Sequence, residues 1–287
     1  MDIRKIDLHM HSTFSDGTDT PEELFGLVRD ESIPLFAVTD HDTFEGSASL
    51  QRLTGRAEGP SAIVGVEFSC RDGKGEYHIL GYGFDPEAAP ISRLAETGHM
   101  NRLKKLRARL EYLEKEHGIS FPRDEQARLS TLDNPGKPHI AGLMVRHGYV
   151  STIREGIVKY LNAFHLPDLY ISPQEAIRAV LDSGGIPVLA HSVFGSGNQR
   201  IEGADLEERV RYLMDAGLQG LEGFYSAFSP AQREAVLDLA RRNRLYVTAG
   251  SDYHGANKPI RLGRTGLEEA DAIPEGLTRF LEDVRRL

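Results

Sequence analysis

The stretch Ile6-Asp7-Leu8-His9-Met10-His11-Ser12-Thr13-Phe14-Ser15-Asp16-Gly17-Thr18, near the start of the 287-residue chain, organises the rest of the sequence. Apolar and polar residues alternate from Ile6 to Met10, so His9 and His11 share one side of a short strand. Two imidazoles on one face can hold a metal ion, although a structural polar pair at a strand end is the alternative. Asp16 follows in a Ser-Asp-Gly turn that presents its carboxylate. The stretch therefore predicts a metal site at a strand end.

Composition is that of an ordinary globular protein, with 40% hydrophobic and 27% charged residues. The single cysteine, Cys70, excludes an internal disulfide framework and zinc sites made of four cysteines. The chain begins with a strand pattern rather than a signal peptide, and no apolar run approaches the roughly 18 residues of a membrane span. We therefore expect a cytoplasmic protein without a membrane partner.

Charge is unevenly distributed along the chain. The net charge of −9 disfavours a long nucleic-acid track, yet residues 92–170 carry 13 Lys and Arg against 9 Asp and Glu. Solvated helix faces would explain this basic segment. A cationic cover over an anionic substrate would explain it equally well.

Short apolar runs alternate with helical patterns, as in α/β proteins. Three helices are expected to begin at Ser/Thr-Pro signatures, at Thr20, Ser172 and Ser229. Continuous apolar runs are typical of strands that are covered on both faces, so we expect a parallel barrel of about seven strands. After the first strand these are Leu35–Val38, Ala62–Phe68, Tyr77–Phe84, Ile186–Ala190, Gln219–Phe224 and Leu245–Ala249.

The alternation of strands and helices is interrupted once. Residues 92–170 contain helical patterns and a turn-rich piece around Asn134-Pro135-Gly136-Lys137-Pro138, but no convincing strand. Because strands on both sides of this segment must pair with one another, it is interpreted as a helical insertion. The expected organisation is a first barrel part at 1–91, the insertion at 92–170 and a second barrel part at 171–287.

Histidines and carboxylates stand at nearly every expected strand end. In barrels and open α/β sheets such side chains meet at one edge. Oxygen and imidazole ligands without thiolate suit Mn²⁺, Zn²⁺ or Fe²⁺, and more than four ligands imply more than one ion. Asp7 and Asp40 are expected to accept the second N–H of metal-bound histidines. The other residues at the ends are His41, Glu67, His78, His191, Glu222, Asp252 and His254.

In this order and spacing, the segments DLHMHSTFSDGT, TDHD, GVE, YHILGYG, LAH and GSDYHG resemble the polymerase-and-histidinol-phosphatase (PHP) family of metal-dependent phosphoesterases. The resemblance implies a distorted seven-stranded barrel with two or three divalent ions. It also implies a hydroxide that bridges the ions, held by Glu67 and Asp252, which attacks phosphorus. The implied ligand sets are His9, His11, Glu67 and Asp252 for one ion, Glu67, His78 and His191 for a second, and Asp16, His41 and His254 for a third.

The insertion resembles that of a stand-alone branch that cleaves phosphate from nucleotides. The branch pattern Arg-x-His-x-Ala followed by Lys-Tyr-Leu is here Lys137-Pro138-His139-Ile140-Ala141, then Lys159-Tyr160-Leu161. A lysine in place of the arginine offers a point charge instead of bidentate geometry. The loop Gly195–Asn198 is either a lid or a plain surface loop. The expected substrate contacts are Lys137, His139, Lys159, His165 and Lys258.

The preferred function is hydrolysis of a phosphomonoester of a small nucleotide, either AMP-like or a nucleoside 3′,5′-bisphosphate. A site roofed by a short helical insertion suits a small ligand better than a polymer. The alternatives are a 5′-to-3′ exonuclease of short RNA and a phosphatase of another small metabolite. A regulatory metal-binding module and an amidohydrolase are weaker alternatives. The oligomeric state is left open.

Overall fold

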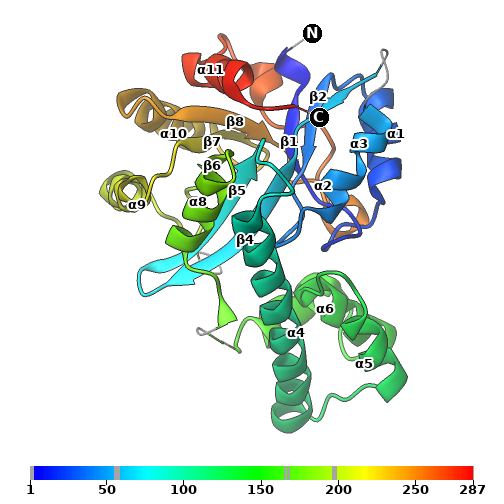
Figure 1. Ribbon diagram of the computed structural model, residues 1–287. Helices are drawn as coiled ribbons and strands as arrows, with labels where there is room; N and C mark the ends of the chain where they lie inside the picture. The colour runs from blue at the N-terminus through cyan, green and yellow to red at the C-terminus, as the bar shows by residue number, and fades with distance from the viewer. Residues whose placement is uncertain (1–2, 55–58, 165, 167–168, 196–198, 287) are drawn as a thin grey trace.

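The computed structural model describes residues 3–54, 59–164, 166, 169–195 and 199–286. Within these ranges eight strands form two sheets, ordered β1-β2-β3 and β4-β5-β6-β7-β8 (Figure 1). The strands are β1 (Asp7–Met10), β2 (Leu35–Val38), β3 (Ser61–Ala62), β4 (Gly65–Asp72), β5 (Gly75–Tyr82), β6 (Ile186–Leu189), β7 (Gly220–Tyr225) and β8 (Tyr246–Gly250).

The mixed α/β class is as expected, but the barrel of seven parallel strands is not confirmed. The expected strand Ala62–Phe68 is divided between β3 and β4, and the Ser47 hydroxyl accepts a hydrogen bond from the Gly65 N–H where the chain changes sheet, at 2.9 Å. β5 runs antiparallel to both β4 and β6. The Asp72 carboxylate accepts backbone N–H groups in the tight turn that makes this hairpin. A buried strand is apolar whichever way it runs, so the hydrophobic pattern did not reveal its direction.

Two seams join the sheets. At one seam Met10 bridges Tyr253, and the His11 N–H donates to the Tyr253 carbonyl at 2.8 Å. At the other seam His41 bridges Glu67. These seams draw the carboxyl ends of β1, β2 and β8 toward β4, which is where the histidine and acidic motifs lie.

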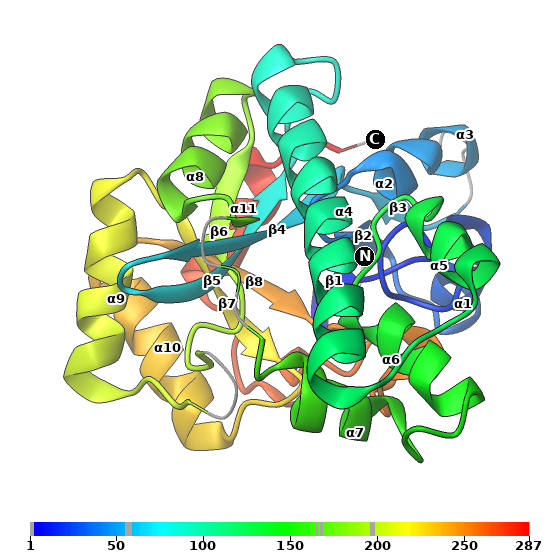
Figure 2. The ribbon, with the colours of Figure 1, turned by 90° about the horizontal axis from the view of Figure 1, so that it is seen from below.

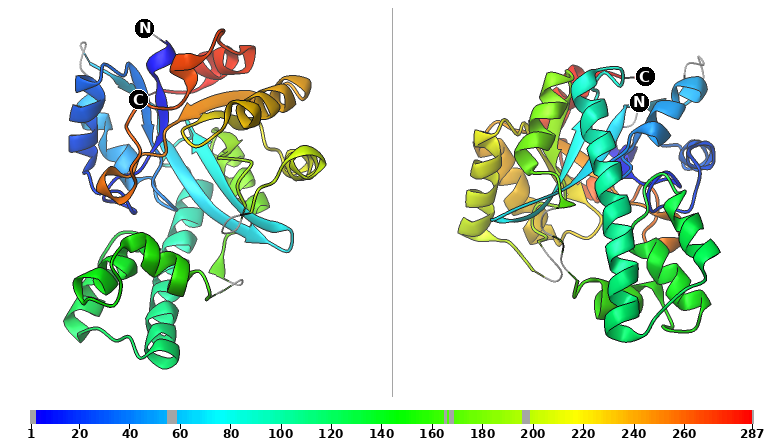
Figure 3. Two further views of the ribbon diagram at one scale, coloured as in Figure 1. Left: turned by 180° about the vertical axis from the view of Figure 1, so that it is seen from behind. Right: turned by 60° about the horizontal axis from the view of Figure 1, so that its bottom comes forward.

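Helices cover the outer faces of the sheets, with the N-terminal helices on one side and α9 and α10 on the other (Figure 3). The three predicted N-terminal signatures are confirmed, since Thr20, Ser172 and Ser229 each form a capping box. The helices around the sheets are α1 (Pro21–Asp30), α2 (Glu45–Ser49), α3 (Gln51–Thr54), α8 (Pro173–Asp182), α9 (Gly203–Asp215), α10 (Pro230–Arg242) and α11 (Glu275–Asp283), with short 3₁₀ turns η1 (Ile3–Lys5), η4 (Gly255–Asn257) and η5 (Leu267–Glu269).

Between β5 and α8 the described chain is helical and extends away from the sheets (Figure 1). It packs around an apolar cluster of its own, which includes Leu106, Leu113 and Ile140. Seen from below, α4 crosses in front of the sheets with α5, α6 and α7 to one side (Figure 2). The elements are α4 (Ala89–His117), α5 (Arg123–Ser130), α6 (Lys137–Arg146), α7 (Ile153–Gly156) and η2 (Ile157–Leu161). None of the helices in the described ranges has the length and hydrophobicity needed to cross a membrane.

Candidate metal centre

The nine predicted ligand residues lie in one cluster at the seams between the sheets. Three groups within it have ligand atoms close enough to share a metal ion: His9, His11 and Glu67; His11, Asp16, His41 and His254; and His41, Glu67 and His78. The strands β1, β4 and β5 and the loops after β1, β2, β6 and β8 supply these side chains. The positions expected from the strand ends are therefore brought together.

In the first group, the ligand atoms of His9, His11 and Glu67 converge on one position. The Nε2 atoms of His9 and His11 lie 3.3 and 3.2 Å from Glu67 Oε2. The same two nitrogens lie 3.6 and 3.3 Å from Asp252 Oδ1. Both nitrogens and Glu67 Oε2 are buried and have no hydrogen-bond partner within the described ranges. Buried polar atoms without partners are costly, so this donor set fits a divalent cation that all of them could coordinate.

Two further groups of candidate ligands gather around two other carboxylate oxygens, one of Asp16 and one of Glu67. Asp16 Oδ1 is also buried and has no hydrogen-bond partner in the part of the chain that the structure describes. It lies 3.3 Å from His254 Nε2 and 3.9 Å from His41 Nε2. Glu67 Oε1 lies 2.9 Å from His78 Nδ1 and 3.2 Å from His191 Nε2. His41 belongs to both regions, because its Nδ1 is 3.1 Å from Glu67 Oε2. Glu67 therefore contacts candidate ligands of neighbouring groups through both of its carboxylate oxygens.

Electrostatics keep the carboxylates of this cluster ionised. Burial alone would raise their pKa values, but nearby histidines hold the pKa of Asp16 and of Glu67 well below the ordinary range. For Asp252, burial is outweighed by Lys258 and His254, and its pKa is also well below the usual value. Burial opposes a charged His9, yet Glu67 and Glu222 raise its pKa well above the ordinary value. The cluster thus attracts positive charge strongly, as a metal centre must.

Backbone strain is concentrated at the same place. Asp42, His191 and Asp252 have positive φ angles of 55°, 30° and 60°. Residues with side chains rarely adopt this left-handed region, and such strain is typical of functional sites. The three residues follow β2, β6 and β8, so the strain turns the chain at the strand ends that carry the cluster.

Asp7 and Asp40 do not accept from histidine rings as expected. The Asp7 carboxylate accepts the backbone N–H groups of Ser251 and Gly263, at 2.9 and 2.8 Å. The Asp40 carboxylate accepts from the Ser12 N–H and hydroxyl, at 2.8 and 2.6 Å. Both are buried next to loops whose N–H or O–H groups need acceptors, so they fix those loops.

Glu222 has the orienting role that the sequence interpretation gave to Asp7 and Asp40. Its Oε1 accepts from His9 Nδ1 at 2.8 Å, and its Oε2 accepts from the His191 N–H at 2.8 Å. This leaves His9 Nε2 directed toward Glu67 and Asp252. Gly250 permits the approach, since a Cβ there would lie 2.2 Å from His9 Cβ. The signal in the sequence was a single carboxylate inside an otherwise apolar strand.

The predicted substrate contacts have different surroundings. Lys258 Nζ lies 2.8 Å from Asp252 Oδ2, so it belongs to the cluster itself. His139 Nδ1 accepts from the Gly136 N–H, and burial lowers the His139 pKa while Asp16 opposes that shift.

Lys137 Nζ donates to Asn162 Oδ1 at 2.6 Å. The Lys159 side chain is 62% exposed. Two further predictions, His165 and most of the loop Gly195–Asn198, lie outside the described residues.

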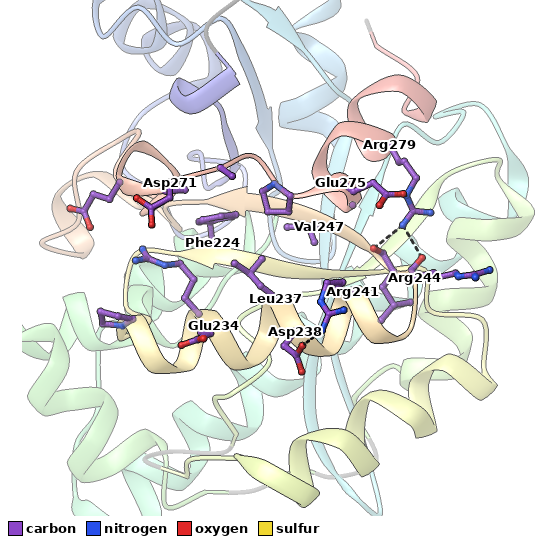
Figure 4. A pocket seen from close by; sticks show the side chains of 18 residues that line it. Phe224, Glu234, Leu237, Asp238, Arg241, Arg244, Val247, Asp271, Glu275 and Arg279 are labelled. Carbon is purple, nitrogen blue, oxygen red and sulfur yellow. Dashed lines mark hydrogen bonds and ion pairs between the residues drawn. The ribbon is translucent and has the colours of Figure 1, made fainter.

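A pocket of about 990 Å³ lies elsewhere, between α10, the start of β8 and the segment leading into α11 (Figure 4). None of the nine candidate ligands lines it. Two of its arginines have partners: Arg241 pairs with Asp238, and Arg279 donates to the carbonyls of Arg244 and Leu245. This pocket is therefore separate from the cluster of candidate ligands.

Relatives of the chain act on phosphate esters. It is 31% identical to a phosphoribosyl 1,2-cyclic phosphate 1,2-diphosphodiesterase of Eggerthella lenta, covering 87% of this chain and 94% of that protein. It is 31% identical to a 3′,5′-nucleoside bisphosphate phosphatase of Chromobacterium violaceum, covering 98% and 97%. It is also 31% identical to the 5′-3′ exoribonuclease Rnm of Salmonella typhimurium, covering 90% and 88%.

Solved structures share the fold. A Bifidobacterium adolescentis protein, described as a candidate metal-dependent phosphoesterase, has a TM-score of 0.78 at 31% identity and covers 91% of each chain. A Chromobacterium violaceum protein, described as an amidohydrolase with bound sulfate and no metal, has a TM-score of 0.81 at 28% identity and covers 99% of this chain and 97% of that one. The PHP domain matches residues 7–175, which include most of the clustered ligands. The chain belongs to the PHP family, and its His, Asp and Glu cluster fits the metal centre of a metal-dependent phosphoesterase.

Proposed function

We propose that the chain is a metal-dependent phosphatase that hydrolyses a phosphomonoester of a small nucleotide, such as an AMP-like molecule or a nucleoside 3′,5′-bisphosphate. The observation that carries the proposal is the convergence of buried atoms without hydrogen-bond partners on His9, His11, Asp16 and Glu67. Relatives named as a bisphosphate phosphatase and a cyclic-phosphate diesterase support phosphate-ester chemistry.

The cluster would hold two or three ions of Mn²⁺, Zn²⁺ or Fe²⁺, in the three ligand sets that follow from the family resemblance. Divalent ions in such a site acidify a water and neutralise phosphate oxygens. Hydrogen bonds within the protein orient the ligand side chains. Glu222 orients His9, and the Asp252 carbonyl accepts from His254 Nδ1 at 2.9 Å, which leaves His254 Nε2 facing Asp16.

Phosphate oxygens that do not face the ions would meet cations from the helical segment. Lys137 and His139 stand at the N-terminus of α6, whose free N–H groups also favour anions. Gly136, which precedes Lys137, lies beside the metal centre, since a Cβ added at Gly136 would be 3.8 Å from Asp16 Cβ. We propose that residues 92–170 serve as the cover of the site and help to exclude water from it.

A second candidate is a 5′-to-3′ exonuclease of short RNA, because relatives of similar identity are named exoribonucleases. Such an enzyme needs a basic groove and aromatic stacking platforms along the strand. The sequence has no Trp and a net charge of −9. These features favour the mononucleotide substrate.

The test is a comparison of kcat/KM for the Mn²⁺-loaded protein on AMP, a nucleoside 3′,5′-bisphosphate, an aryl phosphate and a short 5′-phosphorylated RNA. We expect inorganic phosphate to be released from at least one mononucleotide faster than from the aryl phosphate. A kcat/KM for the RNA that far exceeds that for every mononucleotide would establish the exonuclease instead.

A further inference from the structure

A second charged cluster lies beside the metal centre, on one face of α4. Arg102, Lys105 and Arg109 are spaced three and four residues apart, so they share that face. They are 8%, 5% and 6% exposed, which is unusual for such side chains. Lys137, from the start of α6, acts electrostatically on Lys105. These four residues are named the α4 cation cluster.

The α4 cation cluster has too few partners for its charge. Arg102 Nε pairs with Asp42 at 2.6 Å and donates from another nitrogen to Ser69 Oγ at 2.8 Å. Lys105 Nζ lies 4.0 Å from the centre of the Tyr170 ring. Arg109 interacts with the Tyr170 side chain, but its Nε is buried with no hydrogen-bond partner among the described residues. Lys137 Nζ donates to the neutral Asn162 Oδ1 at 2.6 Å.

Glu76 also acts electrostatically on Arg109 and Lys137, but it already pairs with Arg71 at 3.4 Å. Burial, reinforced by the neighbouring Arg102 and Arg109, lowers the Lys105 pKa to about 7. Burial and Arg109 likewise lower the Lys137 pKa to about 8. Buried cations that repel one another cost stability unless an anion compensates them. The arrangement is therefore explained by a ligand with negative charge.

The α4 cation cluster is adjacent to the metal centre. Ser69 Oγ, which accepts from Arg102, lies 3.4 Å from His41 Nδ1. At Gly136 an added Cβ would lie 3.7 Å from an Arg102 nitrogen and 3.8 Å from Asp16 Cβ. α4 crosses in front of the sheets (Figure 2), and the Arg102–Asp42 pair joins it to the loop after β2.

We propose that Lys105 and Arg109 bind a second phosphate group of the substrate, while its first phosphate reacts at the metal centre. Arg102 is tied to Asp42 and serves as the link between the two regions. The inference rests on the proposed function and narrows it to nucleotides that carry two separate phosphates, such as nucleoside bisphosphates.

The test uses the substitutions Lys105→Met and Arg109→Met, which remove the charge and keep a long apolar side chain. The measured quantity is the ratio of kcat/KM for a nucleoside 3′,5′-bisphosphate to that for the matching monophosphate. We expect this ratio to fall about 10- to 100-fold in each variant, as for loss of a hydrogen bond to a charged group. Lys104→Met and Arg107→Met are the matched controls, because both side chains are exposed on the same helix; their ratio stays at the wild-type value.

A ratio within two-fold of wild type in both variants would overturn the inference, and so would an equal fall in the controls. Metal analysis of each variant verifies that the metal centre is intact. If the wild-type protein hydrolyses neither nucleotide, the proposed function fails, and calorimetry with the same, now unreacted, bisphosphate decides the inference. Binding that is at least 10-fold weaker in the two variants than in the controls supports it; equal binding, or none to the wild type, contradicts it.

Discussion

The metal centre and the α4 cation cluster are neighbouring regions that would bind ligands of opposite charge. In the metal centre, oxygen and nitrogen atoms of buried carboxylates and histidines lie close together without hydrogen-bond partners among the described residues. A divalent cation coordinated by these atoms would supply the missing partner. In the α4 cation cluster, three cations on α4 are more than nine-tenths buried, and among the described residues they have one carboxylate in direct contact. A bound anion would compensate their excess positive charge. A phosphorylated substrate bound with metal ions satisfies both regions at once. The difference indicates that the first region performs the reaction and the second selects the substrate.

The largest effect is expected from Glu67→Gln, in the metal centre. Glu67 contacts five histidines through its two oxygens, so an amide there would lose the bridging position. We expect kcat/KM to fall by about 1000-fold, or ~4 kcal/mol, together with loss of bound metal measured by mass spectrometry. Glu22→Gln, exposed on α1, is the control. Full metal content and activity in the Glu67 variant would remove this residue from the centre.

A smaller effect is expected from Glu222→Gln, which leaves every proposed ligand in place. An amide can accept from His9 Nδ1, but its NH₂ group would then face the His191 N–H. We expect metal affinity to weaken by about 10- to 100-fold, measured by titration of the metal-free protein. Glu234→Gln on α10 is the exposed control. An unchanged affinity would show that His9 needs no orienting carboxylate.

On the cationic side, Lys137→Ala and His139→Ala should weaken phosphate-ester turnover while the metal content stays constant. The expected loss is about 1.5 kcal/mol in each variant, near the low end for contacts with a charged group, because a lysine offers only a point charge. Lys115→Ala, at an exposed position of α4, is the control. Unchanged kcat/KM in both variants would make the start of α6 a scaffold only.

The smallest effect is expected from Lys159→Ala. The side chain is exposed, and its nearest acidic partner, Glu155, lies 4.0 Å away on the same helical turn. Exposed pairs of this kind contribute little, so kcat/KM should change by less than about two-fold. A loss of 10-fold or more in the same assay would mean that η2 presents this lysine to the substrate.

The convergence of the nine candidate ligands could be predicted from the sequence because each of them lies on a strand or in the loop after one, and strand ends meet at one edge of the fold. That they bind metal stays a prediction. The His9 and His11 pair, Glu67 and Asp252 could all be placed in this way. Glu222 was located on its strand but given no role, since nothing in its pattern distinguishes a ligand from a residue that orients one. The antiparallel direction of β5 was missed because burial, which the apolar pattern reports, is independent of strand direction.

The α4 cation cluster was not predictable from the sequence. Lys104, Lys105, Arg107 and Arg109 stand together in one charged run, and charged runs on helices are usually solvated. Only the packing of α4 against the sheets and against Tyr170 separates the buried Lys105 and Arg109 from their exposed neighbours. The excess of basic residues in 92–170 indicated an anionic ligand but not which cations would contact it.

The most direct test of the metal centre is the metal content of the purified protein and of Asp16→Ala. Asp16 Oδ1 lies near His254 and His41, and Asp16 is not a member of the group of His9, His11 and Glu67. Mass spectrometry should find two to three divalent ions per wild-type chain and one fewer in the variant, with a matching loss of phosphate release. A single ion per chain in a fully active wild-type protein would contradict the account.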